Sequence, residues 1–244
     1  MQFASTGVLC FGFICFNVQA AAPTNLILNG DFESGTFANW TVISVPSGPW
    51  AINDGVFDPI GPAAPLPPIS GRYDAVTNQG GPGFRALRQI VAIPTNVLSA
   101  KLVWSDRLRN FAENYVDPSQ EFRVTIRNSA GTVVLQEVFS TTPGDQLQQI
   151  GPNLRSGDLT ALFQAHAGEN VIVSFEEQDI LNVFNVTLDD IALLVSQVPT
   201  IQDECKYDGW QTFVNVNTGQ QVFKNQGACV GFVASKGANW QPYQ

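Results

Sequence analysis

One short stretch, residues 25–35, constrains the fold more than any other part of the sequence. It contains an apolar strand followed by a tight turn at Asn29 and Gly30, and the next strand opens near Trp40. Asparagine and glycine favour such turns. Its natural partner is the late stretch of residues 185–194, which has two acidic residues in its middle. If these first and last strands pair, everything between them forms one closed β-sandwich.

The charge and composition of the chain exclude several classes of function. The net charge is −9, so the chain would repel the phosphates of nucleic acids and of anionic membranes. Hydrophobic residues make up 44% of the 244 residues, which is enough to bury a core. The plentiful glycine, proline and β-branched residues favour turns and strands over helices.

The N-terminus predicts export. Residues 1–22 are apolar and uncharged and end in a small-residue pattern that suits cleavage after Ala20. This is typical of a secretory signal peptide, although no lysine or arginine precedes the apolar core. The alternative is a buried N-terminal strand. No later run approaches the roughly 18 apolar residues of a membrane span. We therefore expect a secreted protein, in the extracellular space, at the cell surface or in the periplasm.

Two cysteines follow the predicted signal peptide, Cys205 and Cys229. In an oxidising compartment they most simply form one disulfide, worth about 3 kcal/mol. A zinc site would need more ligands, and the tail has no histidine to supply them. The composition changes after Val195, so we expect a β-sandwich over residues 23–196 and a small disulfide-stapled module over residues 197–244.

The middle of the chain alternates apolar and polar residues, as strands do when one face is buried. In residues 121–127 the apolar members are Phe122, Val124 and Ile126, and Trp104 also falls on an apolar face. Repeated short alternating segments predict an all-β fold, an antiparallel sandwich of the jelly-roll kind.

Two segments interrupt the predicted strands. Residues 46–70 contain many prolines and predict a long extended loop, and loops of this length are usually functional or mobile. One short helix is expected to begin at Ser156 and to end at Gly168. His166, the only histidine, would lie at the C-terminus of that helix, where it suits the helix dipole better than a catalytic role.

Two stretches resemble known families. The opening motif of residues 25–35 with Trp40, joined to residues 187–192, is similar to the signature of galactose-binding-like jelly rolls, which include carbohydrate-binding modules. The resemblance covers about residues 26–195 and implies the same sandwich fold and a carbohydrate ligand. The tail resembles a short cysteine-pair module of secreted bacterial proteins, which we expect to bind a protein partner.

The resemblance also implies a structural calcium ion where the first and last strands meet. Glu33 is the matching acidic residue of the opening motif, and Asp189 or Asp190 that of the closing one. Calcium takes six to eight oxygen ligands. Because neighbouring residues of a strand face opposite sides, we expect only one of the two aspartates to point at the site. The alternative is that these acids bind turn amides without any metal.

Sugar binding requires flat apolar surfaces and planar polar groups. The aromatic candidates in or beside the loops are Trp50, Tyr73, Phe111 and Tyr115. The polar candidates on the outward faces of the strands are Arg107, Arg109, Glu121, Arg123 and Glu176. The alternative for the charged residues is that they form cross-strand pairs on a solvated face.

Two other functions compete with sugar binding. A glycosidase needs two carboxyl groups roughly 5 to 10 Å apart, and Glu121 with Glu176 would be the pair, but flanking arginines are expected to keep both ionised. The sequence has no metalloprotease motif, phosphate loop or nucleophile elbow, so we predict a non-catalytic protein. An adhesive or structural role outside the cell is the second alternative, because fold alone does not assign function.

Overall fold

The computed structural model describes residues 22–46, 48–59, 64–78 and 81–238. The predicted signal peptide lies outside the described residues except for Ala22. Within the described chain, no helix is long and apolar enough to cross a membrane.

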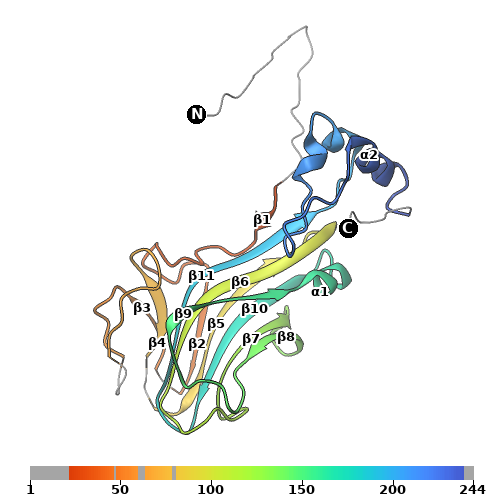
Figure 1. Cartoon of the computed structure of the whole chain (residues 1–244). Coiled ribbons are helices and arrows are strands. Elements are labelled where there is room, and N and C mark those ends of the chain that lie inside the picture. Colours follow the sequence, from red (N-terminus) through yellow and green to blue (C-terminus); the bar gives the residue numbers. More distant parts are fainter. Residues whose placement is uncertain (1–21, 47, 60–63, 79–80, 239–244) are drawn as a thin grey trace.

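Two antiparallel sheets face each other and make up most of the molecule (Figure 1). The six-stranded sheet has the order β3 (Trp50–Asn53), β4 (Asp74–Thr77), β11 (Phe184–Gln197), β6 (Val97–Asn110) and β9 (Gln148–Asp158), and β1 (Thr24–Asn25) also pairs with β11. The five-stranded sheet has the order β2 (Thr41–Val45), β5 (Gly83–Ala92), β10 (Asn170–Asp179), β7 (Gln120–Asn128) and β8 (Val134–Ser140). The predicted antiparallel sandwich is confirmed.

The first and last strands pair as their motifs predict. Thr24 lies opposite Val195, and the N–H of Leu26 donates to the carbonyl of Leu193 at 2.9 Å. The turn after β1 packs directly on β11, because a Cβ atom on Gly30 would lie 2.0 Å from the carbonyl oxygen of Ile191. Glycine is therefore required where the opening motif meets the closing one.

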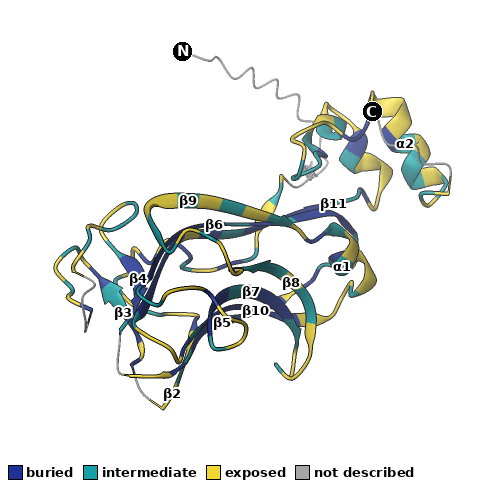
Figure 2. Cartoon of the chain, turned by 60° about the horizontal axis from the view of Figure 1, so that its bottom comes forward, coloured by how far each residue is buried: buried dark blue, intermediate teal, exposed yellow. Residues whose placement is uncertain are grey.

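The core fills the space between the facing sheets, whose strands β11, β6, β10 and β7 are coloured mostly as buried in Figure 2. Phe122, Val124 and Ile126 are fully buried, as the alternation in β7 predicts, and Trp104 is also a core residue. Aromatic rings from both sheets meet here, since Trp104 contacts Phe175 of the opposite sheet edge to face, with centroids 6.0 Å apart.

The sequence patterns do not predict two of the strands. β3 lies inside the segment predicted as a proline-rich loop, and β9 occupies residues predicted partly as a helix start. Ser156 belongs to β9, so its predicted capping role is wrong. The helix α1 (Thr160–Ala165) begins later, and the side chain of Asp158 accepts the N–H of Thr160 at 2.8 Å. β9 carries two glycines and a proline inside an edge strand, which weakens its strand signal.

The tail packs on the end of the sandwich through its own small core. It comprises the 3-10 helices η1 (Gln202–Cys205) and η2 (Gly209–Thr212) and the helix α2 (Gln226–Ala234). The predicted disulfide joins Cys205 and Cys229 and is confirmed. Leu98 of β6 is part of this second core, and Ser99 accepts the N–H of Val216 at 2.9 Å, so the tail is continuous with the sandwich.

Candidate functional site

The predicted aromatic platforms do not form an open surface. Trp50 and Tyr115 are 3% and 0% exposed, because both rings pack in the core, so their predicted role as platforms is wrong. The Tyr115 ring meets Phe184 edge to face at 5.7 Å. Tyr73 is half-buried beneath Gly35, with the Arg72 guanidinium 5.1 Å from its ring centroid, and Phe111 is also half-buried.

Arg107 and Arg109 lie on the outer face of the six-stranded sheet, but that face is covered. The loop between β3 and β4 crosses them, and the Nη1 atoms of Arg107 and Arg109 donate to the carbonyls of Pro67 and Ala64, at 2.6 and 2.5 Å. Neither arginine is on an open surface, so their assignment to an exposed sugar-binding face of the sheet is corrected. The physical reason is that the proline-rich loop is folded onto the sheet.

Glu121, Arg123 and Glu176 do meet, on the outer face of the five-stranded sheet. Arg88 and Arg127 join them, and we call the cluster of Arg88, Arg123, Arg127 and Glu176 the arginine face. Arg127 binds Glu176 through two nitrogens, at 2.6 and 2.8 Å, and Arg123 Nε binds it at 2.8 Å. Arg88 follows at 3.4 Å.

Glu176 is saturated by its own neighbours. Its side chain is 1% exposed, and besides the arginines it accepts the hydroxyls of Ser174 and Thr125 at 2.7 and 3.3 Å. Burial raises the pKa of Glu176, but hydrogen bonds from Arg127, Ser174 and Arg123 outweigh this effect. The pKa is therefore lowered to about 2. A carboxylate with this many donors has no oxygen left for a sugar hydroxyl, so its predicted role as a ligand is corrected.

Glu121 behaves differently from Glu176. Burial raises its pKa to about 7, helped by the charges of Asp117 and Glu137, while Arg123 opposes the shift. Arg123 lies 3.3 Å from Glu121 but 2.8 Å from Glu176. The expectation that the arginines keep both glutamates ionised is therefore wrong for Glu121. With its side chain only 4% exposed, Glu121 is not an open sugar ligand either.

The three predicted calcium ligands converge on one turn, residues 69–73. The Oε1 atom of Glu33 accepts the N–H groups of Arg72 and Tyr73 at 2.7 and 2.9 Å. These bonds lower the pKa of Glu33. Both Asp189 and Asp190 accept from Ser70, at distances of 2.9 to 3.1 Å.

Both aspartates reach this turn because the strand is interrupted between them. Asp190 has a φ of 52°, at a break in the register between β11 and β6. The bulge cancels the alternation, so the expectation that only one aspartate points at the site is wrong. In the described residues, no group of three or more acidic, histidine or cysteine side chains could hold a metal ion. Glu33 and Asp189 accept amides of the turn, and Asp190 accepts the Ser70 hydroxyl. Calcium stays a prediction.

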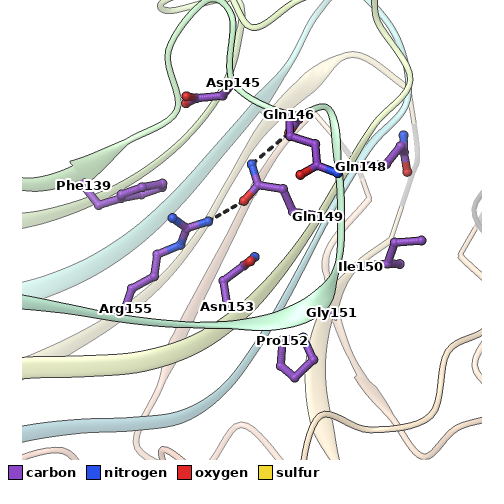
Figure 3. Close-up of a pocket in the computed structure, with 10 residues that line it drawn as sticks. All are labelled: Phe139, Asp145, Gln146, Gln148, Gln149, Ile150, Gly151, Pro152, Asn153 and Arg155. Atoms are coloured by element: carbon purple, nitrogen blue, oxygen red, sulfur yellow. Dashed lines mark hydrogen bonds between the residues drawn. The ribbon is translucent and has the colours of Figure 1, made fainter.

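A pocket of about 650 Å³ lies between β8 and β9, the edge strands of the two sheets (Figure 3). It exists because β9 bulges away from β6. Asp106 and Leu108 lie opposite Asn153 and Gln149, so one residue of β6 faces three residues of β9. The lining residues are Phe139, Asp145, Gln146, Gln148, Gln149, Ile150, Gly151, Pro152, Asn153 and Arg155.

A buried carboxylate beneath the pocket fixes two of its polar side chains. Asp106 is fully buried and accepts the indole N–H of Trp104 at 2.8 Å. It also accepts Nδ2 of Asn153 at 2.9 Å and Nε of Arg155 at 2.5 Å. Because charge-assisted bonds are short and directional, Arg155 and Asn153 are held in place before any ligand arrives.

Arg155 is further fixed by a ring and an amide. Its guanidinium lies over Phe139, with Cζ 4.1 Å from the ring centroid, and its Nη2 donates to Gln149 Oε1 at 2.7 Å. Gln149 in turn donates to the carbonyl of Gln146 at 2.9 Å, and Figure 3 shows this chain crossing the pocket. Arg155 Nη1 and Asn153 Oδ1 make no hydrogen bond with any described residue, which leaves one donor and one acceptor at the pocket.

The sequence patterns do not single out this pocket. Its one visible signal is a concentration of planar polar residues in a short segment that also contains Gly151 and Pro152; these residues are Gln146, Gln148, Gln149, Asn153 and Arg155. Such side chains are common in loops, and only the pairing of β9 with β6 places Asp106 beneath them.

Comparisons with known proteins found solved structures with a similar fold. A scan of protein-family models and a search of curated proteins found no match. Among solved structures, the carbohydrate-binding module TmCBM61, in complex with β-1,4-galactotriose, is 12% identical over 70% of this chain and 97% of its own, with a TM-score of 0.46. The CBM22-1 xylan-binding domain of Paenibacillus barcinonensis Xyn10C is 14% identical over 74% and 99%, with a TM-score of 0.41.

The structure of an enzyme is also similar to this chain. The Stig cyclase Fisc from Fischerella sp. TAU is 13% identical over 72% of this chain and 99% of its own, with a TM-score of 0.44. With TM-scores below 0.5, these likenesses assign neither a ligand nor a site to this chain.

Proposed function

We propose that this protein binds carbohydrate in the pocket between β8 and β9 and does not alter it chemically. One observation carries the proposal: the fully buried Asp106 orients Arg155 and Asn153 while leaving a donor and an acceptor of these side chains unused at the pocket. A polar pair held in this way suits neighbouring hydroxyl groups, each of which can donate and accept.

The size and lining of the pocket support a sugar ligand. Its volume of about 650 Å³ falls within the usual range for small-molecule sites, about 300–1,000 Å³. Three glutamines and one asparagine line it, which are planar groups without charge. The guanidinium plane of Arg155, stacked on Phe139, adds a flat surface. Since the positive charge of Arg155 is offset by Asp106, the site favours a neutral, hydroxyl-rich ligand.

The arrangement of carboxyl groups supports binding without catalysis. Hydrolysis of a glycosidic bond uses two carboxyl groups across the substrate. Asp145 is the carboxylate among the described lining residues, and Asp106 beneath the pocket already accepts three donors. On the outer face of the five-stranded sheet, Glu121 and Glu176 have opposite pKa shifts, but both are nearly inaccessible.

Export from the cytoplasm is part of the same proposal. The apolar residues 1–22 and the disulfide between Cys205 and Cys229 both suit an oxidising compartment. N-terminal sequencing of the mature protein should begin near Pro23, and material that still begins at Met1 would remove this part of the proposal.

A glycan-array screen of residues 23–244 tests the binding. We expect binding to neutral glycans, and an affinity about tenfold lower in Asn153→Ala and in Gln149→Ala, which corresponds to about 1.4 kcal/mol for a lost hydrogen bond. The exposed Gln220→Ala, in the tail, is the matched control and should bind as the parent does. A folded protein with a blank array would reject the proposal and favour the adhesive alternative.

A further inference from the structure

Arg107 and Arg109 form a second, separate arrangement on the outer face of β6. They lie two residues apart and are 8% and 6% exposed beneath the loop between β3 and β4. Each donates through Nη1 to a loop carbonyl, that of Pro67 or Ala64. These contacts hold the loop on the sheet but use one nitrogen of each guanidinium.

The other edge of each guanidinium is covered but makes no hydrogen bond through Nε to any described residue. Arg107 Nε and Arg109 Nε are buried and have no hydrogen-bond partner in the described chain. In arginine, Nε and one terminal nitrogen form the fork that binds a carboxylate or a sulfate through two parallel hydrogen bonds. A buried donor without a partner costs about 1–3 kcal/mol, so two of them on one face need an explanation.

The charge of this face is also unbalanced. The carboxylate whose charge acts on both arginines is that of Asp74, which is fully buried. Asp189, farther along the same face, is bound to Ser70. Burial lowers the pKa of Arg109, and the neighbouring charge of Arg107 lowers it further. Two buried positive charges thus lie close together, and such a pair is unfavourable unless anions compensate for it.

We propose that Arg107 and Arg109 form an oxyanion-binding site beneath this loop, in which the Nε edges of both guanidinium groups bind a carboxylate or a sulfate. The site is distinct from the pocket between β8 and β9, and it does not depend on the function proposed there. A free inorganic ion and the acidic group of a charged sugar share the required chemistry.

Thermal melting with added sulfate tests the site. Sodium sulfate and sodium chloride are compared at equal ionic strength, and we expect sulfate to raise the Tm of the parent along a saturating curve. Arg109→Gln removes the charge and the fork but keeps an amide donor for Ala64, and it should lose the saturating part. Arg72→Gln, at an exposed arginine, is the control and should keep it. An equal response in all three proteins would reduce the effect to general salt exclusion and overturn the proposal.

Two further experiments cover the case in which the variant does not fold, and distinguish an inorganic ion from an acidic sugar. If Arg109→Gln fails to fold, anomalous diffraction from crystals of the parent in selenate should place selenium beside Arg107 and Arg109, and its absence there would overturn the proposal. Galacturonate and galactose are then compared by calorimetry. Binding of galacturonate but not of galactose assigns the site to an acidic sugar, and binding of selenate alone assigns it to an inorganic ion.

Discussion

The pocket and the arginine face both pair arginine with a buried carboxylate, but the pairing has a different result in each. On the arginine face, Glu176 is surrounded by three arginines and two hydroxyls that all point inward at it. In the pocket, Asp106 lies beneath the surface and holds Arg155 from below. A binding site is therefore identified by the polar groups left over after internal pairing, and not by the charges present.

The largest expected effect is on the arginine face. Glu176→Ala would leave three arginines without their common partner, and we expect the free energy of unfolding in urea to fall by about 3–5 kcal/mol. Glycan binding in the pocket should be unchanged, because Glu176 does not line it. Glu137→Ala, at an exposed position on β8, is the control and should cost less than about 0.5 kcal/mol. Lost glycan binding in a folded Glu176→Ala protein would show that the arginine face contributes to the binding site.

Asp106→Asn should affect both stability and binding. The amide keeps the shape of the side chain but leaves Arg155 without its buried negative partner, so we expect a loss of about 2–3 kcal/mol in unfolding free energy. Glycan affinity should fall by at least tenfold, because Arg155 loses its fixed orientation. The measurements are urea unfolding and calorimetric titration. Full affinity in this variant would show that Asp106 does not position the site.

Calcium binding tests whether carboxylates that are already hydrogen-bonded within the protein can still bind a ligand. Glu33, Asp189 and Asp190 are occupied by the turn of residues 69–73, as Glu176 is by its arginines. If calcium nevertheless binds them, a tenfold excess over Kd should add about 1.4 kcal/mol to the stability, visible as a higher Tm. Equal melting temperatures in calcium and in chelator would end the calcium prediction. A clear increase would show that internally bonded carboxylates can still recruit a ligand.

The smallest expected effect concerns pH. The folded-state pKa of Glu121 is about 7, above the ordinary value of 4.5, so ionising it opposes folding. Its contribution is fully present below about pH 4.5 and is lost as the pH rises toward 7. Glu121→Gln should therefore flatten the decline in stability across this window, by about 1 kcal/mol per pH unit, in urea unfolding at several pH values. An unchanged pH profile would contradict the shifted pKa.

Much of the fold can be predicted from the sequence, because alternation reports directly on burial. Phe122, Val124 and Ile126 identify the inner face of β7, and the opening and closing motifs do meet. The two motifs predict that Glu33 and Asp190 lie close together. They do not predict the bulge at Asp190, because no sequence pattern marks it.

The pocket cannot be predicted in the same way. It depends on the offset between β6 and β9, which brings Asp106 beneath Asn153 and Arg155, some fifty positions later in the chain. No local pattern encodes such an offset. Trp50 is misassigned for a related reason, because four residues of strand within a proline-rich segment give too short a signal to reveal that the ring is buried.

β6 passes from the core of the tail to the floor of the pocket. Leu98 packs with the disulfide-linked tail, and Asp106 lies eight residues farther along the same strand, about 26 Å away at roughly 3.3 Å per residue. The strand is therefore a rigid spacer. The tail and the pocket therefore stay about 26 Å apart along β6, so a partner bound to the tail would leave the pocket uncovered.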